Sequence, residues 1–405
     1  MKIAMMTNNY KPFIAGVPIS VERLSDGLRA NGHEVVVFAP DYEGQEEEEH
    51  IVRYRALIKG IVNGFSVPNS FDPHIERRFR EEHFDVIHVH HPMLIGRTAH
   101  YLSKKYRVPL CFTYHTRYEQ YLHYIGAEFI QNAVPNYVNR YADKCDLVFA
   151  PTQSMQDYLE KNGVRTGTAV LPTGLDRAGF AADEEEAAYL RELLLGGRDY
   201  LFCTVARLAK EKNLGFLFRA LAERKKRHGA DFRLALVGDG PYRGQLCRLA
   251  EELGIREDIA FVGAVPNEKV KNYCKAADLF LFSSLSETQG IVLLEAMAAA
   301  TPVLAVKASG VRDVVVNGKN GYMTCASEGG QAQRREDERI FAGKLMDILQ
   351  KKELPFLRQG AFQSACGYQC FQIARQAENY YRAALWSYGE KKNRFSRNHL
   401  ADVIY

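Results

Sequence analysis

Short apolar runs alternate with amphipathic stretches along most of this chain, and this alternation restricts its fold more than any other feature. In the first half the apolar runs are Lys2–Met6, Glu34–Phe38, Val86–Val89, Leu110–Thr113 and Leu147–Ala150. Such short runs, several of them rich in valine or isoleucine, are typical of parallel strands that helices cover on both faces. The stretch Pro18–Asn31 predicts a helix, because proline suits a first turn and Gly32 follows the end. A β–α alternation this regular predicts a doubly wound parallel sheet.

A second series of the same kind fills the other half of the chain. Its apolar runs are Tyr200–Val205, Leu234–Val237, Ile259–Val262, Leu279–Phe282 and Pro302–Val306. A turn-rich piece and an acidic helical stretch, Asp183–Leu195, separate the two series and place a domain boundary within residues 172–199. We predict one domain over 1–172 and a similar one over 173–370. The helical pattern Gln372–Tyr388 predicts a C-terminal helix, with a basic tail over 371–405, that crosses back to the first domain.

Composition excludes several classes of protein. The chain has 405 residues, of which 46% are apolar and 25% charged, so it is neither a disordered chain nor a disulfide scaffold. A net charge of +4 is too small to indicate a nucleic-acid partner. The N-terminus begins with a strand pattern rather than a secretory signal, so we expect the eight scattered cysteines to be reduced thiols in the cytosol. The longest apolar stretch, 291–306, is broken by Glu295 and Pro302, so we expect no membrane span.

The loops after the strands are the places to look for a site, because ligands of open parallel sheets bind outside the carboxyl ends of the strands. The first loop lacks the three-glycine fingerprint, which argues against a nicotinamide cofactor. Gly16 could still let its backbone approach a phosphate, although the residues alone favour a plain strand–helix turn. After Val205, the cations Arg207, Lys210 and Lys212 precede a helix start, which adds partial positive charge. This arrangement outlines a diphosphate site, and the alternative is a solvated basic turn.

Two carboxylates follow the strand Leu279–Phe282. Glu287 lies in the loop, Gly290 opens the next helix, and Glu295 falls on its second turn. A carboxylate accepts two hydrogen bonds, which suits a vicinal diol such as a ribose, and Glu287 could bind hydroxyls of a sugar in the same way. The alternative for Glu295 is a helix-start acid without a ligand.

These motifs together resemble the retaining glycosyltransferases of family 4, and the resemblance covers nearly the whole chain. It rests on Ser-Glu287-Thr-Gln-Gly290 with Glu295 in Glu-Ala-Met, on the spacing of Arg207 and Lys212, and on Val237–Pro241, Phe261–Gly263 and Pro172–Asp176. The family implies an α/β chain with the GT-B fold, in which two Rossmann-like doubly wound parallel-sheet domains face a cleft. The first domain would bind the acceptor and the second the nucleotide sugar.

The resemblance also implies roles for the donor site. Glu295 would bind the nucleotide ribose, Arg207 and Lys212 would neutralise the diphosphate, and the backbone of 263–265 would meet the base. Gly16 would touch the phosphate, although Ala15-Gly16 replaces the commoner Gly-Gly pair. The implied donor-binding set is Gly16, Arg207, Lys212, Gly263, Val265, Glu287, Thr288, Gln289, Gly290 and Glu295.

A histidine at the end of the strand Leu110–Thr113 completes the implied site. His115 would reach the donor sugar near the reaction centre, against the plainer reading of a structural histidine. The catalytic set is then His115, Arg207, Lys212 and Glu287. His88 and His90 share one face of a strand without a matching Cys or Asp, so we interpret them as packing or cleft-wall residues and not as metal ligands.

The chain has no Asp-x-Asp pair at a strand end to hold a divalent ion on a diphosphate, so we expect metal-independent catalysis without a cofactor. The family is thought to react on one face of the sugar, with the donor phosphate helping to deprotonate the acceptor. The anomeric configuration would then be retained.

The segment from Thr113 to Tyr121, together with Ser-Glu287-Thr-Gln-Gly290, looks most like the subgroup that glucosylates diacylglycerol on bacterial membranes. This resemblance implies a UDP-glucose donor and a hexosyltransferase. Ten basic and five acidic residues lie between Arg53 and Arg107, so we expect peripheral binding to the anionic inner face of the cell membrane. The basic stretch Lys391–Arg397 would lie in the tail. A helical-period stripe is either core or a lipid-admitting face, and it comprises Tyr118, Tyr121, Leu122, Ile125 and Phe129.

Two other functions stay open. One is a transferase of the same fold with a soluble or polyprenyl-linked acceptor and GDP-mannose as donor. The other is a non-catalytic or epimerase-like nucleotide-sugar binder. The complete set Arg207, Lys212, Glu287 and Glu295 disfavours the second.

Overall fold

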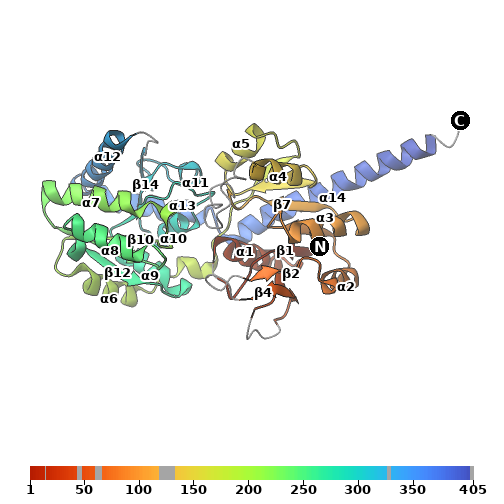
Figure 1. Ribbon diagram of the computed structural model, residues 1–405, viewed down its shortest axis with the longest axis horizontal. Coiled ribbons are helices and arrows are strands. Elements are labelled where there is room, and N and C mark those ends of the chain that lie inside the picture. Colours follow the sequence, from red (N-terminus) through yellow and green to blue (C-terminus); the bar gives the residue numbers. More distant parts are fainter. Residues whose placement is uncertain (14, 43–47, 60–65, 118–132, 326–329, 402–405) are drawn as a thin grey trace. The chain divides into compact units, whose positions relative to one another are not determined.

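The computed structural model describes residues 1–13, 15–42, 48–59, 66–117, 133–325 and 330–401, without the side chains of 133 and 391–401. The chain divides into two compact units (Figure 1). Unit 1 comprises Met1–Gly174 with Cys370–Tyr405, and unit 2 comprises Leu175–Gln369.

Unit 1 is built on a parallel sheet in the order β3-β2-β1-β6-β7-β8-β9. Its strands are β1 (Lys2–Met6), β2 (Glu34–Pro40), β3 (Ile51–Tyr54), β6 (Val86–Val89), β7 (Leu110–Thr113), β8 (Leu147–Ala150) and β9 (Thr168–Val170). A separate antiparallel pair consists of β4 (Ala56–Ile58) and β5 (Val67–Pro68). The helices of unit 1 are α1 (Gly16–Ala30), α2 (Pro73–Glu82), α3 (Ile95–Tyr106), α4 (Ala133–Ala142), α5 (Gln153–Lys161) and α14 (Cys370–Ala401).

Helices cover both faces of this sheet. Successive residues of β1 point to opposite faces, so Ile3 and Met5 join a core with α1 and α14, while Ala4 and Met6 join a core with α2, α3, α4 and α5. Both faces of the sheet are therefore covered by core, which is why its central strands are largely apolar.

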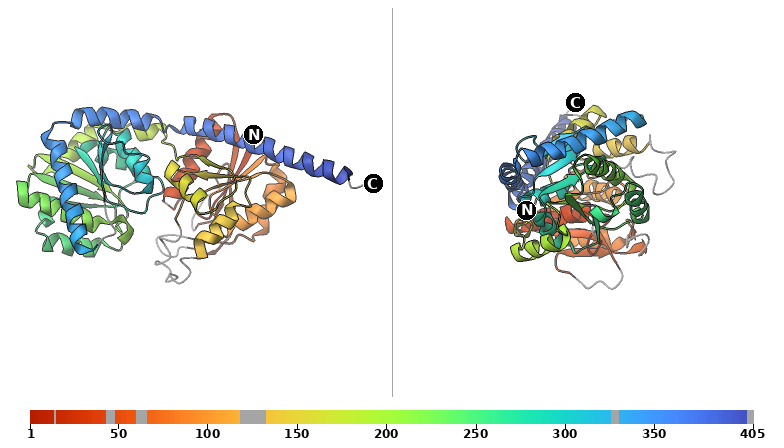
Figure 2. Two further views of the ribbon diagram at one scale, coloured as in Figure 1. Left: turned by 90° about the horizontal axis from the view of Figure 1, so that it is seen from above. Right: turned by 90° about the vertical axis from the view of Figure 1, so that its left-hand side faces the viewer.

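The long C-terminal helix is anchored to the sheet of unit 1. The hydroxyl of Tyr381, which is fully buried, lies 2.6 Å from Nδ1 of His88 on β6. Figure 2 shows α14 running along unit 1 and continuing beyond its sheet.

Unit 2 repeats the plan with the parallel order β12-β11-β10-β13-β14-β15. Its strands are β10 (Tyr200–Val205), β11 (Phe232–Val237), β12 (Ile259–Gly263), β13 (Leu279–Phe282), β14 (Val303–Val306) and β15 (Gly321–Thr324). Its α-helices are α6 (Glu184–Leu195), α7 (Leu214–His228), α8 (Arg243–Glu252), α9 (Val270–Ala276), α10 (Ile291–Ala298), α11 (Ser309–Arg312), α12 (Gln331–Gln350) and α13 (Leu354–Cys366). Short 3-10 turns cover Arg177–Phe180, Lys210–Lys212, Arg256–Asp258 and Asn267–Lys269.

The doubly wound parallel sheets predicted from the alternation are confirmed. In each sheet the chain order reverses once near the middle, between β1 and β6 in unit 1 and between β10 and β13 in unit 2. In doubly wound sheets, ligands bind at such a reversal, outside the carboxyl ends of the strands. Among the described residues, no helix combines the length and the apolar character needed to cross a membrane.

Candidate active site

The strand-order reversal of unit 2 brings two loops from distant parts of the sequence together. The loop after β10 carries Lys212 and the loop after β13 carries Glu287, and Nζ of Lys212 lies 2.7 Å from Oε1 of Glu287. The Ser283 hydroxyl donates a hydrogen bond to the Lys212 carbonyl over 2.9 Å, and the Asn213 side chain donates one to the Ser283 carbonyl over 3.3 Å. These bonds fix the two loops to each other.

Both members of the Lys212–Glu287 pair are shielded from water, with 21% and 16% of their side chains exposed. Burial raises the pKa of Glu287, but the Lys212 charge and hydrogen bonds from Lys212 and Ser284 outweigh it, so the pKa lies below its ordinary value. Glu287 is therefore a carboxylate at neutral pH. The Glu287 carboxylate can accept hydrogen bonds from sugar hydroxyls, and the Lys212 ammonium group beside it can donate hydrogen bonds to phosphate oxygens.

Arg207 makes a second ion pair in the same loop. Its Nη2 donates to Oε1 of Glu211 over 2.7 Å, and Glu211 is only 6% exposed while Arg207 is 45% exposed. Glu211 is a residue that the sequence reasoning missed, although its spacing of four from Arg207 was a usable signal. The Ser284 hydroxyl donates to the Glu211 carbonyl over 3.4 Å, which links this pair to the loop after β13.

Two glycines determine the conformation and support of the loop after β13. Gly290 is the N-cap of α10 with φ of +72°, a left-handed conformation that strains any residue with a side chain. Gly310 in α11 packs so closely on the loop that a Cβ atom would lie 2.5 Å from the Gln289 backbone nitrogen. Its N–H donates to the Glu287 carbonyl over 3.1 Å, so α11 supports the loop from behind. No sequence pattern had pointed to α11.

The remaining donor-site residues lie at the same edge of this sheet. Glu295 is half-buried on the second turn of α10, and Thr288 and Gln289 lie between Glu287 and the helix. Gly263 ends β12 with φ of +90°, and its carbonyl accepts a hydrogen bond from Gly238 over 2.7 Å. Val265, just beyond it, packs against a buried core.

In unit 1, the predicted Gly16 is the exposed first residue of α1, next to the strand-order reversal. The preceding loop is held by Asn8, whose backbone N–H donates to Nδ1 of His91 over 3.1 Å. The Asn8 side chain also accepts from the Ile95 N–H over 3.2 Å and donates to the Met93 carbonyl over 3.1 Å. These bonds tie the loop after β1 to the loop after β6.

His88, His90 and His115 of unit 1 lie close together. His88 and His90 lie on one face with ring centroids 4.3 Å apart and are buried, so the packing interpretation is confirmed. His115 follows β7, is half-buried, and has Nε2 2.9 Å from Nδ1 of His90. Among the described residues, no group of three or more His, Cys, Asp or Glu is arranged to hold a metal ion. Of the predicted site residues, Gly16 and His115 thus belong to unit 1 and the others to unit 2.

The stripe Tyr118, Tyr121, Leu122, Ile125 and Phe129 lies outside the described residues, as do the side chains of Lys391–Arg397.

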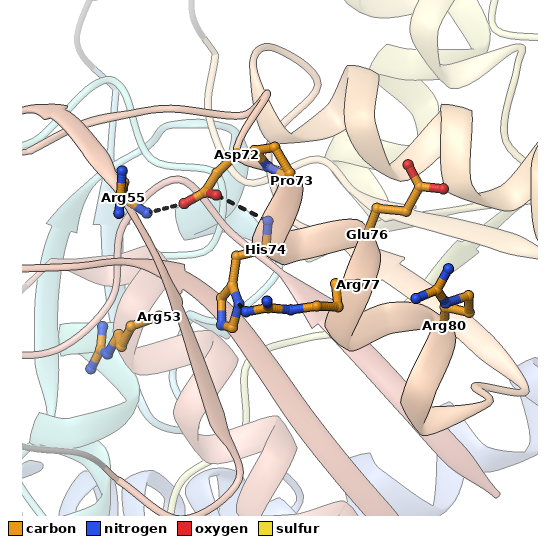
Figure 3. A pocket seen from close by; sticks show the side chains of 8 residues that line it. All are labelled: Arg53, Arg55, Asp72, Pro73, His74, Glu76, Arg77 and Arg80. Carbon is orange, nitrogen blue, oxygen red and sulfur yellow. Dashed lines mark hydrogen bonds between the residues drawn. The ribbon is translucent and has the colours of Figure 1, made fainter.

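Unit 1 also contains a hollow of about 630 Å³, which we call the arginine hollow. It is lined by Arg53, Arg55, Asp72, Pro73, His74, Glu76, Arg77 and Arg80 (Figure 3). The Asp72 carboxylate accepts from the backbone nitrogens of Arg55 and His74 over 2.8 and 3.0 Å. Glu76 is engaged by Lys105 and by the Tyr106 hydroxyl.

The arginines of the hollow differ in whether their guanidinium groups make hydrogen bonds within the protein. Arg53 is fixed by the carbonyls of Pro40 and Lys11, over 3.1 and 3.0 Å, and Arg77 donates to Nδ1 of His74 over 2.8 Å. Within the described part of the chain, the guanidinium groups of Arg55 and Arg80 make no hydrogen bond or ion pair, and both side chains are exposed. The hollow therefore offers cationic donors for an anion.

Exposed apolar side chains lie beside these arginines in the sequence. Leu57 and Ile58 on β4 are 65% and 56% exposed, and Phe71, next to Asp72, is 75% exposed. Because Arg55 is hydrogen-bonded to Asp72 through its backbone, β4 and the start of α2 belong to one surface. We call Leu57, Ile58 and Phe71 the apolar rim.

Comparison with known proteins places the chain in a family. The model described as Glycosyltransferase Family 4 matches residues 14–178, and the model described as Glycosyl transferases group 1 matches residues 186–333. The alpha-monoglucosyldiacylglycerol synthase of Acholeplasma laidlawii is 31% identical over 337 residues, 79% of this chain and 84% of that protein. A GDP-mannose-dependent alpha-mannosyltransferase of Corynebacterium glutamicum is 26% identical, with 80% of this chain and 76% of that protein covered.

A solved structure, Anabaena Alr3699/HepE in complex with UDP, has a TM-score of 0.74 to this chain at 20% identity and covers 95% of this chain and 100% of that one. It shares the fold. With the two family matches and the relative at 31% identity, it shows that this chain is a GT-B glycosyltransferase and belongs to glycosyltransferase family 4.

Proposed function

We propose that this glycosyltransferase moves glucose from UDP-glucose to a membrane lipid such as diacylglycerol, with retained configuration and without a metal ion. The observation that carries the proposal is the Lys212–Glu287 pair at the strand-order reversal of unit 2. Lys212 can donate hydrogen bonds to phosphate oxygens, and Glu287 beside it can accept hydrogen bonds from sugar hydroxyls. The choice of glucose and of a lipid rests on the name of the 31% identical relative.

The donor would be held along the edge of the unit 2 sheet. Glu295 would bind the ribose, the backbone of Gly263 and Val265 would meet the base, and Glu287 would bind hydroxyls of the sugar. Thr288, Gln289 and Gly290 would hold the sugar and the neighbouring phosphate, and Gly16 would contribute a backbone contact to it. All of these residues except Gly16 belong to unit 2.

The chemistry balances without a further reactant. The bond between the anomeric carbon and the diphosphate oxygen breaks, and the acceptor hydroxyl oxygen bonds to that carbon on the same face. The hydroxyl proton passes to the departing phosphate. Arg207 and Lys212 would stabilise the negative charge that develops there, and Lys212 is already held in place by Glu287. His115 would contact the donor sugar from unit 1.

The acceptor would be reached by peripheral binding of unit 1 to the anionic inner face of the cell membrane. Arg55, Arg77 and Arg80 of the arginine hollow would meet lipid phosphates, while the apolar rim would enter the headgroup region. Each basic residue contributes about 1 kcal/mol near an anionic surface, so the arginines and the apolar rim together would give reversible membrane binding.

A second candidate is transfer of mannose from GDP-mannose to a soluble or polyprenyl-linked acceptor. The observation in its favour is the mannosyltransferase relative at 26% identity. Base contacts made by the backbone at Gly263 would not distinguish uracil from guanine by side-chain chemistry.

A panel of nucleotide sugars tests the donor. The full chain is heated with UDP-glucose, UDP-galactose, UDP-N-acetylglucosamine and GDP-mannose, and slow hydrolysis is followed in parallel. We expect UDP-glucose to raise the melting temperature most and to be hydrolysed fastest. A larger effect of GDP-mannose would replace the first candidate by the second, and no effect of any donor would contradict both.

A further inference from the structure

Four histidines of unit 1 are packed at the carboxyl ends of β6 and β7. His88 lies 4.3 Å from His90 between ring centroids, and His90 lies 5.1 Å from His115 with ring planes 25° apart. Burial lowers the pKa of His88 and of His91 to about 3, and burial together with neighbouring histidines lowers the pKa of His90 and His115 well below 6.5. All four rings are therefore neutral at physiological pH, and each carries a single N–H.

The position of the proton on His90 follows from its two neighbours. Its Nε2 lies 3.4 Å from the sulfur of Met5, and a thioether has no proton to donate. If Nε2 lacked the proton, two lone pairs would face each other in a buried site. The proton is therefore on Nε2, and Nδ1 of His90 must be a hydrogen-bond acceptor.

The tautomer of His115 is then determined by His90. Nδ1 of His90 lies 2.9 Å from Nε2 of His115, and because Nδ1 accepts, Nε2 of His115 must carry the N–H. We propose that His90 is a positioning residue that holds His115 in the Nε2–H tautomer, so that His115 meets the substrate only as a hydrogen-bond acceptor through Nδ1. This rests on the proposed contact between His115 and the donor sugar. It specifies that the group met by Nδ1 is a proton donor such as a sugar hydroxyl, and not a carboxylate or phosphate oxygen.

Two substitutions at His90 separate the acceptor atom from the ring. His90→Phe keeps a buried ring but removes Nδ1, whereas His90→Asn restores an acceptor oxygen near the Nδ1 position. The matched control is His88→Phe, which removes an equally buried imidazole from the same strand face. His88 is bonded to Tyr381 and Thr113, both over 2.6 Å, and not to His115.

The tautomer is measured on the full chain by long-range ¹⁵N–¹H NMR of labelled histidines, with His115 assigned from a His115→Gln spectrum. We expect His115 as the Nε2–H tautomer in the wild type, in His90→Asn and in His88→Phe, and a mixture of tautomers in His90→Phe. The kcat of transfer should fall about tenfold in His90→Phe, the worth of about one hydrogen bond, and recover in His90→Asn.

An Nδ1–H tautomer in the wild type, or an unchanged tautomer in His90→Phe, overturns the inference. The NMR measurement needs neither donor nor acceptor. If the tautomer is as expected while His115→Gln transfers glucose normally, the proposed role of His115 is wrong and the positioning by His90 stands.

Discussion

Nζ of Lys212 lies 2.7 Å from Oε1 of Glu287, although 75 positions of sequence separate the two residues. They meet because β10 and β13 are neighbours at the point where the strand order reverses, so the loops after these strands leave the sheet side by side. At that point the Lys212 ammonium group can contact a diphosphate, and the Glu287 carboxylate can contact the sugar attached to it.

Loss of the Arg207 charge should slow turnover far more than it changes folding. Arg207→Ala removes a charge that would act on the departing diphosphate, and removal of one such donor costs on the order of a hundredfold in kcat. The control is Arg248→Ala on α8, which removes an exposed arginine of the same unit and should leave kcat unchanged. A normal kcat in Arg207→Ala would remove this residue from the catalytic set, and a strict need for a divalent ion after EDTA would contradict the metal-free mechanism.

The Lys212–Glu287 pair should give unit 2 a stability that depends on pH. Because the pKa of Glu287 is lowered below 4.5, the pair stabilises the folded state above that pH and loses this effect as pH falls through the lowered pKa. In Lys212→Met only the Ser284 hydrogen bond still opposes burial, so we expect the pKa of Glu287 to rise and stability to fall as pH increases past 4.5. Thermal unfolding from pH 3 to pH 7 should therefore show a widening gap between wild type and variant. A gap that is constant with pH would mean that the pair does not stabilise the fold.

Glu295→Gln should weaken nucleotide binding about ten- to a hundredfold, because a charge-assisted hydrogen bond to the ribose is worth about 1.5–3 kcal/mol. Calorimetric titration with UDP measures this directly. An unchanged Kd for UDP would show that Glu295 does not bind the ribose.

The central strands were predictable because they are largely apolar and buried on both faces. The predicted bounds of β6, β7, β8, β10 and β13 agree with the structure residue for residue. Five of the described strands were not predicted: the edge strands β3, β9 and β15, which have less apolar sequences, and the separate pair β4 and β5. An edge strand is half-buried and short, so its sequence lacks the continuous apolar run that marks a central strand.

The sequence motifs predicted which residues form the site, but they did not predict which of these residues contact one another. The positions of Lys212 and Glu287 followed from strand ends and family spacing, but their ion pair depends on strand order, which spacing does not reveal. His88 and His90 were placed on one face by the period of a strand. The bond from His90 to His115 required the additional fact that β6 and β7 are adjacent.

Membrane binding by unit 1 should depend on both the arginine hollow and the apolar rim. Arg55→Ala and Arg80→Ala should each weaken binding to anionic vesicles up to about fivefold, and high salt should weaken it further. Phe71→Ser should weaken binding at every salt concentration, because an apolar contact is not screened. Arg248→Ala in unit 2 is the control of equal charge. Co-sedimentation with vesicles measures the binding, and equal affinity for neutral and anionic vesicles would reject the electrostatic part.

Transfer of glucose from UDP-glucose to diacylglycerol is the most direct measurement of the central claim. The full chain is incubated in EDTA with radiolabelled UDP-glucose and vesicles that contain diacylglycerol and an anionic phospholipid, and the anomeric configuration of the lipid product is determined by NMR. We predict α-glucosyl diacylglycerol, formed at a rate that rises with the anionic lipid content. Transfer to a soluble acceptor with none to diacylglycerol, or product formation only from GDP-mannose, would contradict the account.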